Sequence, residues 1–172
     1  MTPAPDARKT VYLALGSNLG DRVANLRDAI ARLPKAGVQV TSVSSVYETK
    51  AMYKTDQPDF LNLVLEAKTR VLPRVLMRRL QTIERELGRR RAVANGPRTI
   101  DIDVLLYGRF VIATPDLAVP HPRIEERRFV LEPLAEIAPN LRHPIHKKTA
   151  AQLLAAVKHQ VVRKLDLRIE FP

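Results

Sequence analysis

The stretch GPRTIDIDV spans residues 96–104 and alternates apolar with acidic side chains once it has passed its proline. Successive side chains of a β-strand point to opposite faces, so its apolar residues are expected to face a core while Asp101 and Asp103 share the other face. Two ionised carboxylates side by side repel each other, and a hard divalent cation with oxygen ligands offsets that repulsion. A solvated strand face accounts for the same spacing. The stretch therefore predicts a strand, and the spacing alone leaves both a metal site and a solvated face open.

A cluster of arginines precedes this strand. Arg98 stands directly before it, and four more arginines occupy positions 85 and 89–91. A guanidinium fork binds phosphate through two parallel hydrogen bonds. Cations at the end of a helix also interact favourably with its dipole, which accounts for Arg85 and for part of 89–91 but not for Arg98. The arginines and the two aspartates together predict a clamp for a triphosphate.

Outward from this stretch, hydrophobic periodicity predicts alternating strands and helices. Strands are expected at 11–15, at 38–47 with an irregularity in its middle, at 60–68 and at 100–106. Helices are expected after Asp21, which suits an N-cap, and from Pro73, which suits a first helical turn. The resulting β-α-β-β-α-β order is typical of the ferredoxin-like arrangement. We therefore predict an α+β fold whose antiparallel sheet is flanked by helices.

The rest of the chain is expected to add to this core. The additions are a hairpin return at 110–112, partly helical structure at 123–138, a helix at 150–158 and a final strand at 161–171. Residues 1–9 are predicted to be a flexible tail and 10–172 a single domain, because no linker or repeat divides them. The loops at 48–58 and 89–97 exceed the usual length of a connection and are expected to act as lids.

Composition limits the class of protein and of partner. The 172 residues include no cysteine, so a disulfide framework and thiolate metal sites are excluded. No apolar run reaches the roughly 20 residues of a membrane span, and residues 1–9 lack the apolar core of a secretory signal, which predicts a soluble, cytoplasmic protein. The net charge of +11 favours a polyanionic partner, which could be nucleic acid, an anionic membrane or a nucleoside triphosphate. Aromatic residues at 5%, with no tryptophan, weigh against single-strand binding.

Six blocks of sequence, in order along residues 11–139, resemble one known family. They are LGSNLG at 15–20, SSVYET at 44–49, QPDFLN at 57–62, GPRTIDID at 96–103, VPH at 119–121 and RRFVL at 127–131. The family is 6-hydroxymethyl-7,8-dihydropterin pyrophosphokinase of folate biosynthesis. The resemblance implies a ferredoxin-like fold and a reaction in which ATP and the hydroxymethyl pterin give AMP and the pterin diphosphate.

The resemblance also implies roles for individual residues. Asp101 and Asp103 would hold two Mg²⁺ ions, and Arg89 and Arg98 would be catalytic. The positions that match ATP contacts are Gln81, Glu84, Arg91, His121 and Arg127, and those that match pterin contacts are Thr49, Met52, Phe60, Asn62 and Phe129. Positions that differ from other members are Lys50, Asn95, Asp116 and Pro122.

The physical chemistry of the pterin positions is consistent with this implication. Phe60 and Phe129 could sandwich a flat ring, and Asn62 offers donors and an acceptor to its amide edge. Without the resemblance, ordinary core aromatics would account for both phenylalanines, and a surface side chain would account for His121. The expected partners are ATP and the pterin, with no nucleic acid and no membrane, and the expected state is a monomer.

Two other classes of function compete with this interpretation. A basic RNA-binding module on the same fold would need exposed aromatics on its central strands, and the strand at 100–106 carries none. An unrelated magnesium-dependent nucleotidyltransferase would use the same aspartates but release pyrophosphate from ATP in place of AMP.

Overall fold

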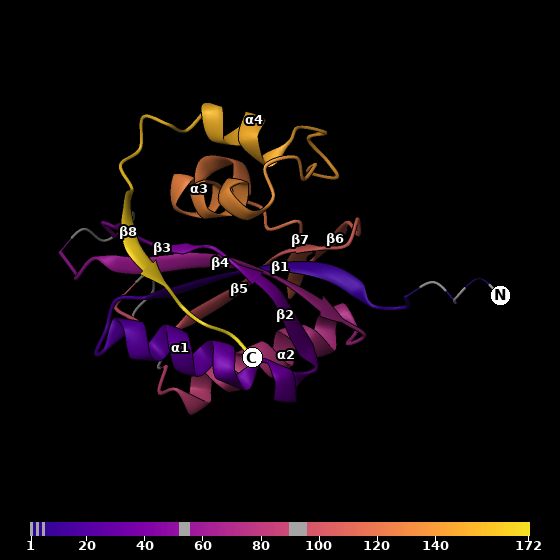
Figure 1. Ribbon diagram of the computed structural model, residues 1–172, viewed down its shortest axis with the longest axis horizontal. Helices are drawn as coiled ribbons and strands as arrows, with labels where there is room; N and C mark the ends of the chain where they lie inside the picture. Colours follow the sequence, from indigo (N-terminus) through magenta and orange to yellow (C-terminus); the bar gives the residue numbers. More distant parts are fainter. Residues whose placement is uncertain (1, 3, 5, 52–55, 90–95) are drawn as a thin grey trace.

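The computed structural model describes residues 2, 4, 6–51, 56–89 and 96–172, and a mixed sheet-and-helix architecture fills these ranges (Figure 1). The strands are β1 (Lys9–Ser17), β2 (Val38–Val43), β3 (Ser45–Thr49), β4 (Phe60–Thr69), β5 (Asp101–Tyr107), β6 (Ile112–Thr114), β7 (Leu117–Val119) and β8 (Arg163–Arg168). The α-helices are α1 (Arg22–Arg32), α2 (Pro73–Glu86), α3 (Arg128–Ile137) and α4 (Ala150–Ala155).

The main sheet runs in the order β5-β1-β4-β3-β8, and β2 pairs with β4 beside β3. Each of these pairings is antiparallel. β1 pairs along its whole length with β4, from Lys9 opposite Thr69 to Ser17 opposite Leu61. Both are covered on their two faces, which is why their sequences read as nearly continuous apolar runs rather than as a strict alternation.

Helices pack on both faces of the sheet (Figure 1). α1 and α2 lie below it, and α3 and α4 lie above it. The predicted start signals are confirmed, since the Asp21 carboxylate accepts the Ala24 N–H at 3.0 Å and Pro73 opens α2. The longest helix of the described residues, α2, has 14 residues, and none of the helices among them is long and apolar enough to cross a membrane.

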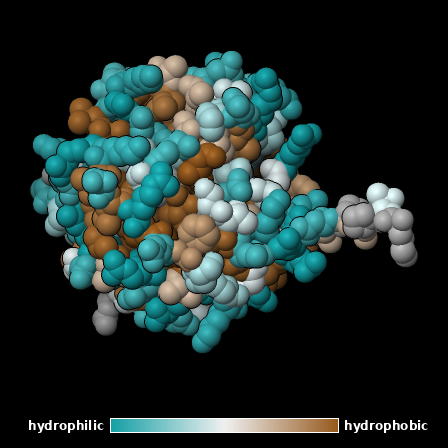
Figure 2. Space-filling model, in the orientation of Figure 1, coloured by the Kyte–Doolittle hydropathy of each residue, from teal (hydrophilic) through white to brown (hydrophobic). Residues whose placement is uncertain are grey.

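These features confirm the predicted α+β, ferredoxin-like core, with an antiparallel sheet flanked by helices and a helix and strand added near the C-terminus. Figure 2 shows hydrophilic side chains over most of the same face of the molecule, with apolar side chains exposed between them.

Four predicted elements differ in detail. The helix expected at 150–158 is shorter, because α4 ends at Ala155 and turns follow it. The irregularity expected within 38–47 is a break at Ser44, which separates β2 from β3 and whose hydroxyl accepts the Val64 N–H at 3.0 Å. The hairpin return expected at 110–112 is wrong, because the strand begins at Ile112 and β6 pairs with β7 instead of with β5. The final strand is shorter than the predicted 161–171, because only Arg163–Arg168 lies along β3.

Candidate functional site

Three adjacent strands place the site. Gly16 of β1 lies opposite Asn62 of β4 on one side and opposite Asp101 of β5 on the other. This row lies near the end of the sheet where β1 finishes at Ser17. A Cβ on Gly16 would come within 3.0 Å of the Asn62 side-chain oxygen and 3.5 Å of the Phe60 ring. The missing side chain therefore keeps space open between the amide of Asn62 and the carboxylate of Asp101.

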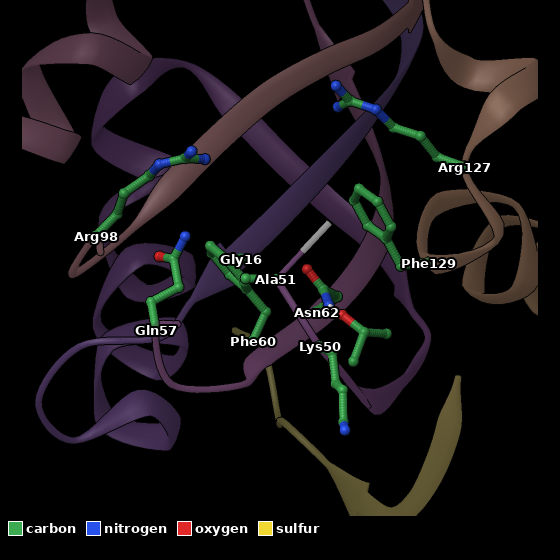
Figure 3. A pocket seen from close by; sticks show the side chains of 10 residues that line it. Gly16, Lys50, Ala51, Gln57, Phe60, Asn62, Arg98, Arg127 and Phe129 are labelled. Carbon is green, nitrogen blue, oxygen red and sulfur yellow. Dashed lines mark hydrogen bonds between the residues drawn. The ribbon is translucent and has the colours of Figure 1, made fainter. Parts of the chain in front are cut away.

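A first cavity of about 90 Å³ opens over this row (Figure 3). Four of the five predicted pterin residues line it, namely Thr49, Phe60, Asn62 and Phe129. The fifth, Met52, lies outside the described residues. Asn62 is 7% exposed, and its amide donates to the Thr49 hydroxyl at 2.8 Å, which fixes the orientation of the amide in the cavity wall. The remaining lining residues are Gly16, Lys50, Ala51, Gln57, Arg98 and Arg127.

Each aromatic ring of this cavity lies against a guanidinium. The Cζ of Arg98 is 5.6 Å from the centre of the Phe60 ring, and that of Arg127 is 5.5 Å from the centre of the Phe129 ring. A cation within about 6 Å of a ring centroid is attracted by the ring quadrupole. The two aromatic side chains thus help to hold two cations at the cavity.

A second cavity of about 230 Å³ lies on the outer side of β5. The predicted site residues that line it are Gln81, Glu84, Arg89, Asp101, Asp103 and His121. Arg127, which matched an ATP contact, lines the first cavity instead, and Arg91 lies outside the described residues. Asp101 joins the two cavities, because it lines the second and accepts a hydrogen bond from Arg98 of the first.

Asp101 is held between two arginines. One carboxylate oxygen accepts from Nη1 of Arg89 at 2.7 Å, and the other accepts from Nη1 of Arg98 at 3.0 Å. The same Arg89 nitrogen also contacts Glu84, a buried carboxylate that accepts the Ile102 N–H of β5 at 2.9 Å. Burial raises the pKa of Glu84 above its ordinary value. Glu84 therefore anchors Arg89 to the strand that carries the aspartates.

Asp103 is in a different electrostatic environment from Asp101. Burial, followed by the negative charges of Asp101 and Glu84, raises the pKa of Asp103 to about 7. The positive charges of Arg127 and Arg89 oppose this rise but do not cancel it. Carboxylate oxygens are ligands that Mg²⁺ accepts, together with water and phosphate oxygens, so Asp101 and Asp103 fit a hard divalent cation. The lone pairs of Asp101 that its arginines leave free remain available for such a contact.

A second group of metal-ligand residue types, Glu125, His143 and His146, lies elsewhere in the described part of the chain. Nδ1 of His143 accepts two backbone N–H groups, from Ile145 and from His146, each at 3.1 Å. A neutral imidazole that accepts at Nδ1 carries its proton on Nε2, where a metal would otherwise bind. The group is therefore not a metal centre in this arrangement.

His121 is fixed beside the second cavity. Its backbone N–H donates to the Leu105 carbonyl of β5 at 2.8 Å, and its Nδ1 accepts the Arg123 N–H at 3.2 Å. Burial, and then the positive charge of Arg127, lowers the pKa of His121 to about 4. The ring is thus neutral near pH 7 with its proton on Nε2, and it can donate one hydrogen bond.

Sequence reasoning passed over Asn18 and Gln57. Asn18 is 1% exposed, its side-chain oxygen accepts the Arg98 N–H at 2.8 Å, and its amide donates to Gln57 at 2.8 Å and to the Pro58 carbonyl at 3.1 Å. It therefore joins the start of the GPRTIDIDV stretch to the loop that precedes β4. The signal in the sequence was an asparagine directly after a strand, which by itself indicates only a turn.

The fold and the site together define an enzyme of the phosphoryl-transfer class, with an arginine-flanked carboxylate pair beside an aromatic-walled cavity. A family model described as 7,8-dihydro-6-hydroxymethylpterin-pyrophosphokinase (HPPK) matches residues 12–139, and the chain belongs to this family. The match confirms the predicted family and the pyrophosphokinase activity in folate synthesis that defines it. It also favours this activity over the RNA-binding and nucleotidyltransferase alternatives.

Curated relatives agree with the family. The chain is 55% identical over 127 residues to 2-amino-4-hydroxy-6-hydroxymethyldihydropteridine pyrophosphokinase of Bacillus subtilis, covering 73% of this chain and 76% of the relative. The corresponding enzyme of Aquifex aeolicus is 48% identical over 139 residues, covering 81% and 86%. The folic acid synthesis protein fol1 of Pneumocystis carinii is 46% identical over 137 residues, which are 80% of this chain but 18% of that protein.

Solved structures support the fold. The crystal structure of wild-type Plasmodium falciparum HPPK-DHPS with STZ-DHP aligns with a TM-score of 0.70 and 17% sequence identity. It covers 87% of this chain and 43% of the solved chain. This chain thus spans less than half of that longer protein, and at this identity the likeness shows the fold alone.

Proposed function

We propose that this chain transfers pyrophosphate from ATP to the hydroxymethyl group of 6-hydroxymethyl-7,8-dihydropterin and releases AMP, with two Mg²⁺ ions held by Asp101 and Asp103. The observation that carries the proposal is the position of Asp101, which joins the two cavities and is bonded to an arginine on each of its oxygens. A reaction between two bound molecules requires such a meeting point, because most of the catalysis is positioning and charge compensation.

The pterin would occupy the first cavity. Phe60 and Phe129 offer apolar faces to a flat ring, and the fixed amide of Asn62 offers hydrogen bonds to its edge. The hydroxymethyl arm would then extend toward Arg98, which lines this cavity and also contacts Asp101.

The triphosphate would lie along the second cavity, with Gln81 and His121 in its wall. The pterin hydroxyl would attack the β-phosphorus in line, and AMP would leave. Arg89 and Arg98 would offset the charge that develops on the transferred group, since forked guanidinium groups suit phosphate oxygens. Mg²⁺, when bound by Asp101 and Asp103, would draw negative charge from the phosphate oxygens. No side chain in the site is assigned as a general base.

The two loops expected to act as lids, at 48–58 and 89–97, lie partly outside the described residues. Their closure over the substrates remains a prediction. Equal hydrogen-exchange rates in both loops with and without substrates would contradict it.

The proposal also includes a monomer that acts in the cytoplasm on these two small molecules and on no nucleic acid. The absence of cysteine suits a reducing compartment. Sedimentation at the 19.4 kDa of a single chain tests the oligomeric state. RNA affinity tighter than ATP affinity would contradict the partner assignment.

The decisive experiment combines the protein with ATP, MgCl₂ and the hydroxymethyl dihydropterin and identifies the nucleotide product. We expect AMP with the wild type, none after addition of EDTA, and almost none with Asp103→Asn. Glu125→Gln is the matched control, because it removes a carboxylate that lies outside both cavities. Release of pyrophosphate or ADP, or full activity of Asp103→Asn, would refute the proposal. Calorimetric titration of Mg²⁺ in the presence of a non-hydrolysable ATP analogue tests the number of ions.

A further inference from the structure

The segment between α4 and β8 is bound to the chain just ahead of α3. Both ends of the Gln160 side-chain amide take part in this contact. Its nitrogen donates to the Glu126 carbonyl at 2.6 Å, and its oxygen accepts the Arg128 N–H at 2.9 Å. The two partners lie on either side of Arg127, which lines the first cavity.

The second of these bonds caps a helix. α3 begins at Arg128, and its N-cap residue Arg127 makes no side-chain capping bond. The first N–H groups of a helix have no partner within the helix, so a side chain, a ligand or water has to satisfy them. Gln160, 32 positions away, satisfies the first of them. The start of α3 is thus defined by a residue of the C-terminal segment.

Arg128 makes the contact reciprocal. Its guanidinium donates to the Lys158 carbonyl at 2.8 Å and to the Gln160 carbonyl at 2.6 Å, and its Nε donates to Glu132 one turn further along α3 at 2.9 Å. The side chain of Arg128 therefore faces the C-terminal segment. Its two neighbours in sequence, Arg127 and Phe129, face the first cavity (Figure 3).

The same segment also reaches the opposite wall of the cavity. Arg163, where β8 begins, pairs with Glu48, which directly precedes the cavity residue Thr49. Between these two attachments the segment lines an open groove of about 550 Å³ that shares Thr49, Lys50, Ala51 and Phe129 with the first cavity.

From these contacts we infer that Arg128 and Gln160 are positioning residues for pterin binding: they fix the first turn of α3 and thereby hold Phe129 against the first cavity. This inference rests on the proposed function, which places the pterin in that cavity. It assigns a role in substrate binding to the C-terminal segment, for which the sequence alone suggested none.

The test compares Gln160→Ala with Gln152→Ala. Gln152 is a matched control, because its side-chain oxygen also accepts a backbone N–H, that of Thr149 at 2.9 Å, in the cap of α4 and outside both cavities. Gln160→Ala removes the two side-chain hydrogen bonds that fix the position of Phe129 through the first turn of α3. KM for the pterin should therefore rise about 5- to 10-fold. KM for ATP and kcat should stay within about twofold of the wild-type values. The reason is that the variant weakens binding of the pterin ring by the same amount in the ground state and in the transition state. Gln152→Ala should lower the melting temperature and leave KM for the pterin unchanged.

A conservative variant separates positioning from folding. Gln160→Glu keeps the acceptor for the Arg128 N–H but replaces the donor to the Glu126 carbonyl with an oxygen that repels it, so it should recover only part of the pterin affinity that Gln160→Ala loses. The double variant Arg128→Ala/Gln160→Ala should raise KM for the pterin by less than the product of the two single effects. Both residues belong to the same contact between the C-terminal segment and α3, so each single substitution already disrupts it.

The outcomes distinguish this inference from the function on which it rests. If the wild type releases no AMP, both the proposed function and this inference are refuted. A wild type that releases AMP, together with a Gln160→Ala variant whose KM for the pterin equals that of the wild type, would overturn the inference and leave the proposed function standing. The inference would also be overturned if Gln152→Ala raised that KM as much as Gln160→Ala.

Discussion

At the scale of single residues, the two aspartates of the GPRTIDIDV stretch have unequal environments although they share one strand face. Asp101 is paired with Arg89 and Arg98, whereas the pKa of Asp103 is raised by burial and by the charges of Asp101 and Glu84. The sequence predicted only that the two side chains share one strand face, because alternation gives their direction and not their partners. The distribution of the arginines between them depends on the loop that precedes the strand.

This asymmetry predicts stability changes of opposite sign in the metal-free protein. Asp101→Asn removes the charge that Arg89 and Arg98 share and leaves Arg89 with Glu84 alone, so it should lower the free energy of unfolding by about 1–2 kcal/mol. Asp103→Asn removes a repelled carboxylate and should raise the melting temperature by about 2–4 °C. The pKa of Asp103 is raised, so its ionised form destabilises the folded state, and the gain should be larger at pH 8 than at pH 5.

Thermal unfolding in EDTA at both pH values measures these changes. Both variants should still lack transferase activity. Asp103→Asn should therefore be more stable than the wild type although it is inactive. Equal destabilisation by the two substitutions would contradict the assigned environments.

A second prediction concerns the protonation of His121. The lowered pKa, about 4, means that between pH 4 and 6.5 the unfolded chain binds a proton at this residue that the folded protein does not. The contribution of His121 to the free energy of unfolding is therefore fully present above pH 6.5 and is lost as the pH falls toward 4. The ring resonances of His121 should keep their neutral positions down to about pH 5 in NMR titrations. His121→Gln should flatten the acid side of the stability curve, and His159→Gln, which changes an exposed residue, should not.

At the scale of elements, the end of β1 organises the site. Gly16 lies between Asn62 and Asp101 in register, and Asn18 follows two residues later with hydrogen bonds to the backbone of Arg98 and Pro58. β1 thus lies between the strand that lines the first cavity, β4, and the strand that lines the second, β5. The predicted strand at 11–15 contained the apolar part of β1 and stopped just short of these functional positions.

The third prediction belongs to this element. Gly16→Ala keeps a backbone conformation that alanine can adopt, but its Cβ would press on the Asn62 amide at 3.0 Å. Either the amide rotates away from Thr49 or the cavity narrows, so KM for the pterin should rise about 10-fold while the protein remains folded. Circular dichroism checks the fold and steady-state kinetics check KM. An unchanged KM for the pterin would show that the ring does not approach Gly16.

At the scale of the whole molecule, the net charge of +11 acts on substrates before they bind. A positive field attracts ATP, which is an anion, but not the pterin, which is neutral. Raising the ionic strength from 0.05 to 0.5 M shortens the screening length from about 14 to about 4 Å. KM for ATP should therefore rise about 3- to 10-fold, whereas KM for the pterin should change little. Steady-state kinetics over this range of NaCl check the prediction, and parallel increases of both constants would contradict a charge-specific effect.

The three-layer arrangement also explains why the site needs the complete fold. The walls of the first cavity come from β1, from the end of β3 and the loop after it, from β4 and the residues before it, from the segment before β5 and from the start of α3. These segments are separated by tens of residues and meet only because the sheet order places β4 and β5 on either side of β1. The C-terminal segment then attaches to two of these walls through Gln160 and Arg163.

The sequence by itself determined the order of the core elements and the faces of its strands. It did so because periodicity, the Asp21 cap and the Pro73 start are local properties, and a side chain that alternates along a strand does so in any surroundings. The aspartate pair was predicted from the same strand alternation, whereas Phe60 and Phe129 were predicted as site residues from the resemblance to the family.

Only the tertiary structure decided which charges meet, where the cavities lie and what fixes α3. The bonds from Glu84 to the Ile102 N–H, from Asn18 to Arg98 and from Gln160 to Arg128 join residues 18, 80 and 32 positions apart. No local pattern encodes such contacts, because each depends on the packing of elements that the chain brings together only after the sheet has formed. Burial, which sets the pKa of Asp103 and of His121, likewise exists only once the layers have closed.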